Sequence, residues 1–105
     1  KKNKDIQMVV CNDKIKAIQT AIKNLNVDVI ILDDGFQSLY IDRDLDLVMI
    51  NAKMPRCKYN LFPRGDGREP IAGLRRADAV ITTRGEVNSH IRDVCLKNSI
   101  NMFLI

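Results

Sequence analysis

The chain has no tryptophan, and phenylalanine and tyrosine together make up only 5% of its residues. Proteins that bind single-stranded nucleic acids combine a basic groove with aromatic side chains on which the bases stack. The net charge of +4 would allow contact with nucleic acid. However, no aromatic residues are interleaved with the basic ones, and the sequence contains no known nucleic-acid module. We therefore expect no nucleic-acid partner.

Cysteine is also scarce, with only Cys11, Cys57 and Cys95 in the whole chain and no C-x-x-C pair. An odd number of widely spaced cysteines predicts neither a disulfide framework nor a zinc site. Cys11 and Cys95 fall on predicted apolar faces, and we expect both to be small buried hydrophobic groups. Such cysteine usage is typical of a reducing, cytoplasmic compartment.

Three kinds of segment are absent from the sequence. No apolar run approaches the roughly 18 residues that a membrane span needs, and no signal peptide is recognisable. No G-x-x-x-x-G-K-[ST] segment is present, so the chain has no loop of this kind to wrap nucleotide phosphates. The chain begins at Lys1 rather than Met and ends in an apolar run. We expect it to be an internal piece of a longer protein, a single partial domain over residues 1–105.

The most informative segment that is present has the sequence VIILDDGFQ, at residues 29–37. A continuous, β-branched apolar run after a helical pattern predicts a strand buried on both faces, at residues 27–33 near the centre of a sheet. Asp33 and Asp34 then lie at the carboxyl end of that strand, where open α/β sheets bind ligands. In P-loop phosphotransferases an Asp at this position holds Mg²⁺ beside the nucleotide phosphates. The plain alternative is an acidic turn.

Strand and helix patterns alternate along the rest of the chain. Strands are expected at residues 6–10, 46–52, 78–83 and 102–105, and helices after a cap at Asn12 or Asp13, at residues 71–76 and at residues 86–98. Residues 53–70 contain three prolines and two glycines, which predicts a long functional loop. This order predicts an α/β fold with a mostly parallel sheet and helices on both of its faces.

Basic residues gather around the predicted loops. The set comprises Arg64, Arg68, Arg75, Arg76 and Arg84. Arginine binds phosphate groups through paired, charge-assisted hydrogen bonds. The set therefore favours a nucleotide or an anionic sugar lipid as the ligand.

Four short motifs, in this order and at this spacing, resemble the tetraacyldisaccharide 4'-kinase family, the lipid A enzymes of Gram-negative bacteria. The motifs are DDGFQ at residues 33–37, RDL at 43–45, REP at 68–70 and ADAV at 77–80. The resemblance covers roughly residues 9–84. It implies that the fold is the core fragment of a P-loop kinase.

The sequence also departs from the family pattern. Ser38 stands where the family usually has a His after DDGFQ, and Asn51 stands where the next strand usually ends in Asp. The segment MPRCKYN replaces a glycine-rich segment, and LFPRGDGREP replaces LPAGPLREP. These differences leave the resemblance intact. By that resemblance, the loop that carries LFPRGDGREP would contact the substrate.

The resemblance implies roles for five residues. Asp33 and Asp34 are the expected catalytic residues and Mg²⁺ ligands. Gln37 would bind a sugar hydroxyl or a phosphate, or would only stabilise its turn. Arg68 would clamp a phosphate. We expect Asp33, Asp34, Gln37 and Arg68 to form one cluster, because open α/β sheets gather ligand groups at their carboxyl edge. Glu69 would accept a hydrogen bond from the sugar, or would cap the short helix that follows, where the helix dipole favours an acid.

Four other polar residues and the only histidine have weaker expectations. Thr83 and Arg84, after a strand, are candidates for nucleotide binding or for a plain turn. Arg43 and Asp44 are expected to form an ion pair that fixes the loop to the sheet. His90 is expected on the surface or at a helix end.

For the complete protein, the resemblance implies transfer of the ATP γ-phosphate to the 4'-hydroxyl of a tetraacyldisaccharide 1-phosphate, with Mg²⁺. The enzyme would lie in the cytoplasm, peripheral to the inner membrane that carries its acylated substrate. The isolated chain is expected to be inactive because it lacks the phosphate-binding loop. Two alternatives stay open: a fragment of another P-loop small-molecule kinase or ligase, and a non-catalytic binding module.

Overall fold

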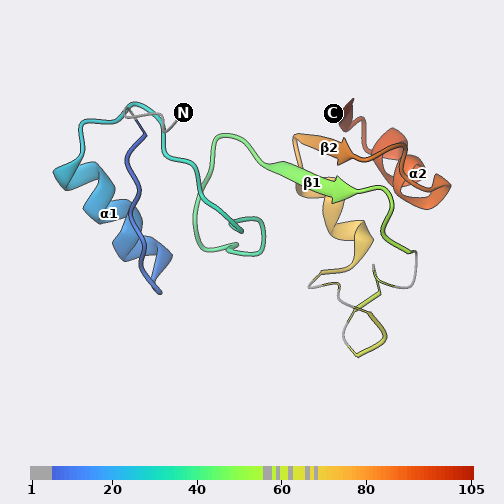
Figure 1. Ribbon diagram of the computed structural model, residues 1–105, viewed down its shortest axis with the longest axis horizontal. Helices are drawn as coiled ribbons and strands as arrows, with labels where there is room; N and C mark the ends of the chain where they lie inside the picture. Colours follow the sequence, from blue (N-terminus) through green and yellow to red (C-terminus); the bar gives the residue numbers. More distant parts are fainter. Residues whose placement is uncertain (1–5, 56–57, 59, 62, 66, 68) are drawn as a thin grey trace. The chain divides into compact units, whose positions relative to one another are not determined.

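A computed structural model describes residues 6–55, 58, 60–61, 63–65, 67 and 69–105. The chain divides into two compact units, Lys1–Gly35 and Phe36–Ile105 (Figure 1). Each unit is considered by itself. The single partial domain expected for residues 1–105 stays a prediction.

Among its described residues, the first unit contains one helix, α1, at Lys14–Asn24. The Asp13 side chain caps it by accepting hydrogen bonds from the backbone N–H groups of Ile15 and Lys16, at 3.0 and 3.2 Å. Such a cap satisfies N–H groups that have no partner inside the helix. The predicted helix start at Asn12 or Asp13 is therefore confirmed at Asp13.

The strands predicted at residues 27–33 and 6–10 are wrong. Neither segment forms a strand or joins a sheet in the described part of the chain. The side chains of Val29 and Ile31 are 74% and 89% exposed, so the segment is not buried on both faces. A strand exists only through hydrogen bonds to a neighbouring strand, and the described residues of the first unit supply none. An apolar run predicts burial, but it does not supply the neighbour.

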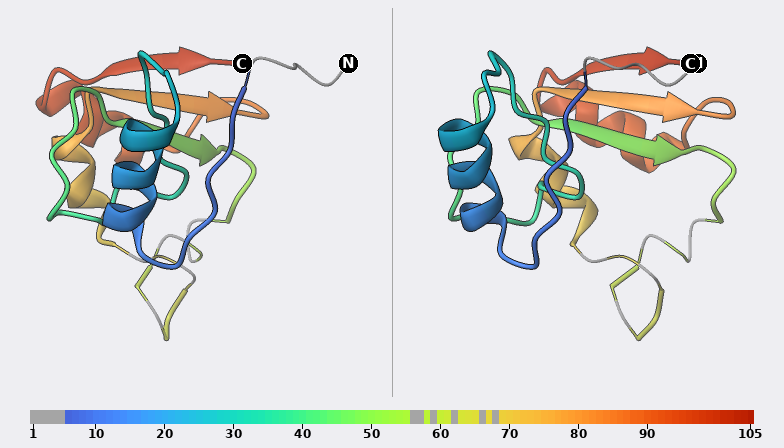
Figure 2. Two further views of the ribbon diagram at one scale, coloured as in Figure 1. Left: turned by 90° about the vertical axis from the view of Figure 1, so that its left-hand side faces the viewer. Right: turned by 60° about the vertical axis from the view of Figure 1, so that its left-hand side comes forward.

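The second unit contains a three-stranded parallel sheet in the order β1-β2-β3. The strands are β1 at Leu47–Asn51, β2 at Ala79–Thr83 and β3 at Asn101–Leu104. Their arrowheads point the same way in Figure 2. The central position, expected for residues 27–33, belongs to β2. The predicted α/β class with a parallel sheet is confirmed.

Helical segments lie between these strands in the described part of the second unit. They are η2, a 3₁₀ helix at Ile71–Arg76, and α2, an α-helix at Ser89–Lys97. The Asn88 side chain caps α2 by accepting a hydrogen bond from the N–H of Ile91 at 3.1 Å. The predicted bounds of the short helix agree with η2, whereas α2 is shorter than the predicted helix at residues 86–98.

The core of the second unit lies between the sheet and these two helical segments. Val80, Ile91 and Cys95 are its largest fully buried residues. The prediction that Cys95 is buried is thus confirmed, whereas Cys11 is exposed and that prediction is wrong. Cys57 lies outside the described residues.

The opposite face of the sheet is apolar and largely open. Because side chains alternate along a strand, Met49, Ile81 and Phe103 form one row across the three strands. Met49 and Phe103 are exposed. In parallel sheets both faces are normally covered by helices, and helices on this second face stay a prediction.

Candidate active site

Asp33 and Asp34 occupy a turn at the end of the first unit, and both residues are exposed. Asp34 has a φ of 52°, in the left-handed region that Asp tolerates better than most residues. Gly35 is required here, because a Cβ at this position would lie 2.9 Å from the Cβ of Leu32. The residues form the acidic turn that the sequence offered as one alternative. Their catalytic and metal-binding roles stay predictions.

No group of three or more His, Cys, Asp or Glu side chains that could hold a metal ion occurs among the described residues. Mg²⁺ is often bound by only one or two carboxylates, together with substrate phosphates and water. Asp33 and Asp34 match that donor chemistry.

Gln37 and Ser38 lie near the start of the second unit, in contrasting environments. Gln37 is exposed, and its backbone carbonyl accepts a hydrogen bond from the N–H of Leu39 at 3.0 Å. Ser38, which replaces the His of the family pattern, is buried. Because Asp33 and Gln37 belong to different units, their expected grouping stays a prediction. Arg68, the fourth member of that group, lies outside the described residues.

Arg43 is anchored by four hydrogen bonds. Its Nε and Nη2 donate to the two carboxylate oxygens of Asp46, at 2.7 and 3.0 Å. Its Nη1 donates to the carbonyl oxygens of Ser38 and Ile41, at 2.7 and 2.9 Å. The hydrogen bond that Arg43 donates to the Asp46 carboxylate raises the pKa of Arg43. The structural role expected for Arg43 agrees with this geometry, but the predicted partner Asp44 is wrong.

Asp46 also joins this loop to β2. Its N–H donates to the side chain of Asp78 at 2.7 Å. In return, its carbonyl oxygen accepts hydrogen bonds from the N–H groups of Asp78 and Ala79, at 3.0 and 3.3 Å. The RDL and ADAV motifs, more than thirty positions apart, therefore meet through Asp46.

Glu69 pairs with Arg76 at the other end of η2. Nη1 of Arg76 contacts Oε1 of Glu69, and Nη2 donates to Oε2 at 3.0 Å. The N-cap residue of η2 is Pro70, and no side chain makes a capping hydrogen bond there. Glu69 therefore does not cap the helix through its side chain. Arg76 was expected only as a member of a basic set, and its pairing with Glu69 was not predicted.

Thr83 and Arg84 follow the central strand at the carboxyl edge of the sheet. Thr83 lies beside Asn51 in the register of β1 and β2, and its carbonyl oxygen accepts from the N–H of Ala52 at 2.9 Å. Arg84 has a φ of 66° and Gly85 a φ of 128°, so the chain turns sharply here. The position at the ligand-binding edge agrees with the expected site, while the nucleotide contact stays a prediction.

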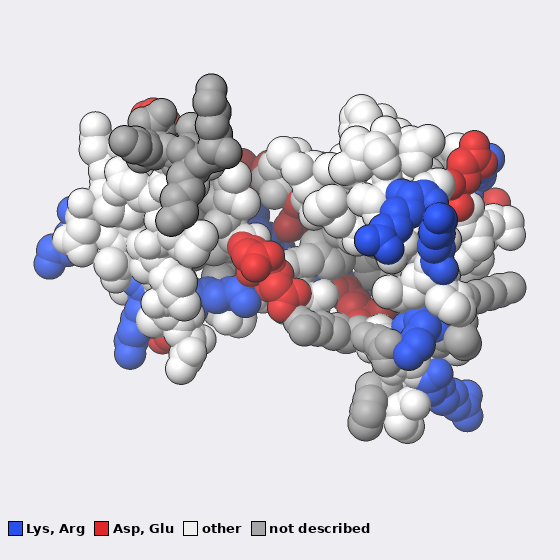
Figure 3. Space-filling view, in the orientation of Figure 1, with Lys and Arg blue, Asp and Glu red and all other residues white. Residues whose placement is uncertain are grey.

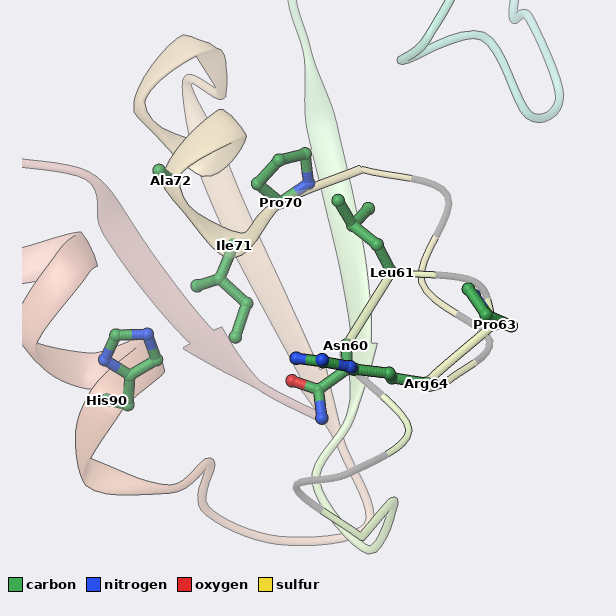
Figure 4. Close-up of a pocket in the computed structure, with 8 residues that line it drawn as sticks. All are labelled: Asn60, Leu61, Pro63, Arg64, Pro70, Ile71, Ala72 and His90. Atoms are coloured by element: carbon green, nitrogen blue, oxygen red, sulfur yellow. The ribbon is translucent and has the colours of Figure 1, made fainter.

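A pocket of about 620 Å³ opens beside η2 (Figure 4). The residues that line it are Asn60, Leu61, Pro63, Arg64, Pro70, Ile71, Ala72 and His90. Arg64 reaches across Asn60 toward the side of the pocket where His90 lies. Figure 3 shows lysine and arginine side chains over the loop that follows β1. The pocket combines an apolar wall with basic and amide groups, which suits an anionic group attached to an apolar body.

His90 lies in the first turn of α2 and is exposed, as expected for a helix-end residue. Its place in the pocket was not predicted, because periodicity places a residue on a helix but does not show which loop faces it.

In the described part of the chain, no helix is long and apolar enough to cross a membrane.

Comparison with known proteins identifies the family. The family model described as tetraacyldisaccharide-1-P 4'-kinase matches residues 1–104. The chain is 40% identical to the tetraacyldisaccharide 4'-kinase of Halothermothrix orenii over 79 residues, and 39% identical to that of Syntrophotalea carbinolica over 77. It is also 39% identical to that of Aquifex aeolicus over 82 residues.

These matches cover 75, 73 and 78% of this chain but only 21, 22 and 25% of the three relatives. The chain thus spans about a quarter of their length or less. No solved structure matches it. Because the family model covers nearly every residue, the chain belongs to the tetraacyldisaccharide-1-P 4'-kinase family.

Proposed function

We propose that the complete protein containing this chain transfers the γ-phosphate of ATP to the 4'-hydroxyl of a tetraacyldisaccharide 1-phosphate, a step of lipid A synthesis. The observation that carries the proposal is the family match over residues 1–104. It favours this kinase over other P-loop kinases or ligases. A binding module without activity is the remaining alternative, and it is tested below.

Asp33 and Asp34 are the residues we assign to Mg²⁺. Their carboxylates are hard oxygen ligands, exposed at one turn and adjacent in the chain. When bound, Mg²⁺ would neutralise charge on the ATP phosphates. One carboxylate would bind the ion, and the other would orient a water or a neighbouring group. Gln37, exposed three residues later, would hydrogen-bond the sugar or a phosphate.

The sugar lipid is assigned to the second unit. Glu69 immediately precedes Pro70 and Ile71, which line the pocket beside η2. Arg64 and His90 line the same pocket and suit a phosphate group, and Arg68 in the same loop would add a bidentate contact. The apolar wall of the pocket would contact the less polar part of the ligand. Thr83 and Arg84 would contact the nucleotide.

The chemistry of the substrates suggests where the protein works. ATP is a cytoplasmic metabolite, whereas four acyl chains hold the acceptor in a lipid bilayer. We therefore assign the complete protein to the cytoplasmic face of the inner membrane, bound peripherally. Basic side chains such as those in Figure 3 favour contact with anionic lipid surfaces.

The test is phosphate transfer by a complete protein that carries this chain, with γ-labelled ATP and the acylated disaccharide. Label should appear on the lipid, and a disaccharide already phosphorylated at the 4'-position should accept none. Hydrolysis of ATP without labelled lipid would indicate a different acceptor. Failure to use ATP at all would support the binding module. The 105-residue chain alone should give no turnover.

A further inference from the structure

We propose that Arg76 is a positioning residue that orients the Glu69 carboxylate toward the acceptor sugar. The inference rests on the proposed function, because it specifies how Glu69 would meet its substrate. It concerns a residue that neither the DDGFQ nor the REP motif contains.

The first observation is the paired contact between the two side chains. The guanidinium meets both carboxylate oxygens of Glu69 through Nη1 and Nη2. Two parallel contacts fix the rotation of the carboxylate as well as its position. The hydrogen bond that Arg76 donates to the Glu69 carboxylate also raises the pKa of Arg76, which keeps the guanidinium charged.

The second observation ties Arg76 to Phe36 of the DDGFQ motif. The guanidinium carbon lies 4.6 Å from the centre of the Phe36 ring, in cation–π geometry. Nη2 also approaches the Phe36 carbonyl oxygen at 3.4 Å. Within the second unit, Arg76 thus connects Phe36 of the DDGFQ motif to Glu69 of the REP motif.

The third observation is that Gly73 leaves room for this arrangement. A Cβ at residue 73 would lie 2.0 Å from Oε1 and 2.9 Å from Cγ of Glu69. The Glu69 side chain therefore folds directly over Gly73 to reach Arg76. Any larger residue at position 73 must displace the Glu69 carboxylate. Because the Glu69 side chain is flexible, it can move without disturbing the backbone.

The partial exposure of the Arg76–Glu69 ion pair favours a role in orienting the Glu69 carboxylate over a role in stabilising the fold. The side chains of Arg76 and Glu69 are 33% and 19% exposed. Solvent therefore screens this pair more than the Arg43–Asp46 pair, whose side chains are 16% and 18% exposed, and it contributes less to folding. An arginine also holds geometry that a lysine cannot, since lysine has neither the planar fork nor the stacking surface. A charge-preserving Arg76→Lys change should therefore disturb positioning while leaving the fold intact.

The experiment compares Arg76→Lys, Gly73→Ala and the double variant in the complete protein, with Arg92→Lys as the matched control. Arg92 pairs with Glu86 and takes no part in these contacts. Each single variant should lower kcat/KM for the acceptor about tenfold. The KM for ATP and the melting temperature should stay at the unsubstituted values. The double variant should be no worse than either single one, because both disturb the same carboxylate.

The proposal is overturned if Arg76→Lys and Gly73→Ala leave kcat/KM for the acceptor unchanged. It is also overturned if the loss affects ATP equally and follows the melting temperature. If the unsubstituted protein transfers no phosphate, the proposed function fails, and calorimetric binding of the acylated disaccharide decides the role of Arg76. Weaker binding by both variants then supports the role, whereas equal binding, or no binding by the unsubstituted protein, overturns it.

Discussion

Arg43 and Asp46 form a two-point ion pair, with Nε and Nη2 of the guanidinium 2.7 and 3.0 Å from the two carboxylate oxygens. The same guanidinium binds two backbone carbonyls of the preceding loop, and Asp46 binds the start of β2. One arginine thus connects the loop that follows DDGFQ to the central strand of the sheet. The RDL motif has a structural explanation that requires no contact with substrate.

Replacing Arg43 with Met should lower the free energy of unfolding by about 1.5–3 kcal/mol. The change removes four hydrogen bonds and leaves Asp46 without its partner, in a pair whose side chains are only 16% and 18% exposed. Urea unfolding provides the measurement. Arg92→Met is the control, since its partner Glu86 is largely exposed, and it should cost under about 1 kcal/mol. Equal losses for the two variants would contradict the account.

Ile91 should be the most sensitive position of α2, because it is almost completely buried between the helix and the sheet. Ile91→Ala should cost about 2–5 kcal/mol through lost burial and the cavity it leaves. Leu96→Ala, on the exposed side of the same helix, should change the stability by no more than about 0.5 kcal/mol. Thermal and urea unfolding should rank the two variants in this order, and the reverse order would show that the helix packs through a different face.

Cys95 should make stability depend on alkaline pH. Burial raises the pKa of its thiol, so the native state holds the proton more tightly than the unfolded state. The contribution of the protonated Cys95 thiol to the free energy of unfolding is fully present below the unfolded pKa of about 8.5. It is lost as the pH rises through the higher native pKa. Cys95→Ala should remove this part of the pH dependence, as measured by urea unfolding between about pH 7 and 10.

Cys11→Ala is the control for that measurement, because Cys11 is exposed. It should keep the decline with pH seen in the unsubstituted protein. If Cys95→Ala shows the same decline, other groups cause it, and Cys95 has no part in it.

Much of the second unit could be predicted from the sequence. Residues 46–52, 78–83 and 102–105 were expected as strands, and β1, β2 and β3 lie within one residue of these bounds. Residues 71–76 were expected as a short helix and form η2. These segments combine local signals with partners close in the chain, since each strand pairs with the next one along the sequence.

The segment at residues 27–33 shows where such reasoning stops. Its apolar run is stronger than that of any strand in the sheet, yet it forms no ladder among the described residues. The apolar pattern indicates that burial of the segment is favourable. A strand also needs a neighbouring strand with free hydrogen-bonding groups. Propensity alone cannot specify that neighbour.

The candidate site was predictable in part for a similar reason. Sequence order placed Thr83 at the carboxyl edge of a strand, because backbone direction follows from topology. It did not show that Arg43 selects Asp46 over the adjacent Asp44, or that Arg76 folds back to Glu69. Those choices depend on how the backbone folds and where each side chain points, which spacing along the chain does not specify.

The most direct measurement is steady-state phosphate transfer to the acylated disaccharide by the complete protein, unsubstituted and with Asp33→Asn. Asp28→Asn, an exposed aspartate of the same unit, is the control. The account predicts that Asp33→Asn lowers kcat roughly a hundredfold or more, with little change in KM for the lipid, because charge develops on the phosphates in the transition state. Asp28→Asn should keep full activity. An unchanged kcat for Asp33→Asn would mean that Asp33 is only a turn residue.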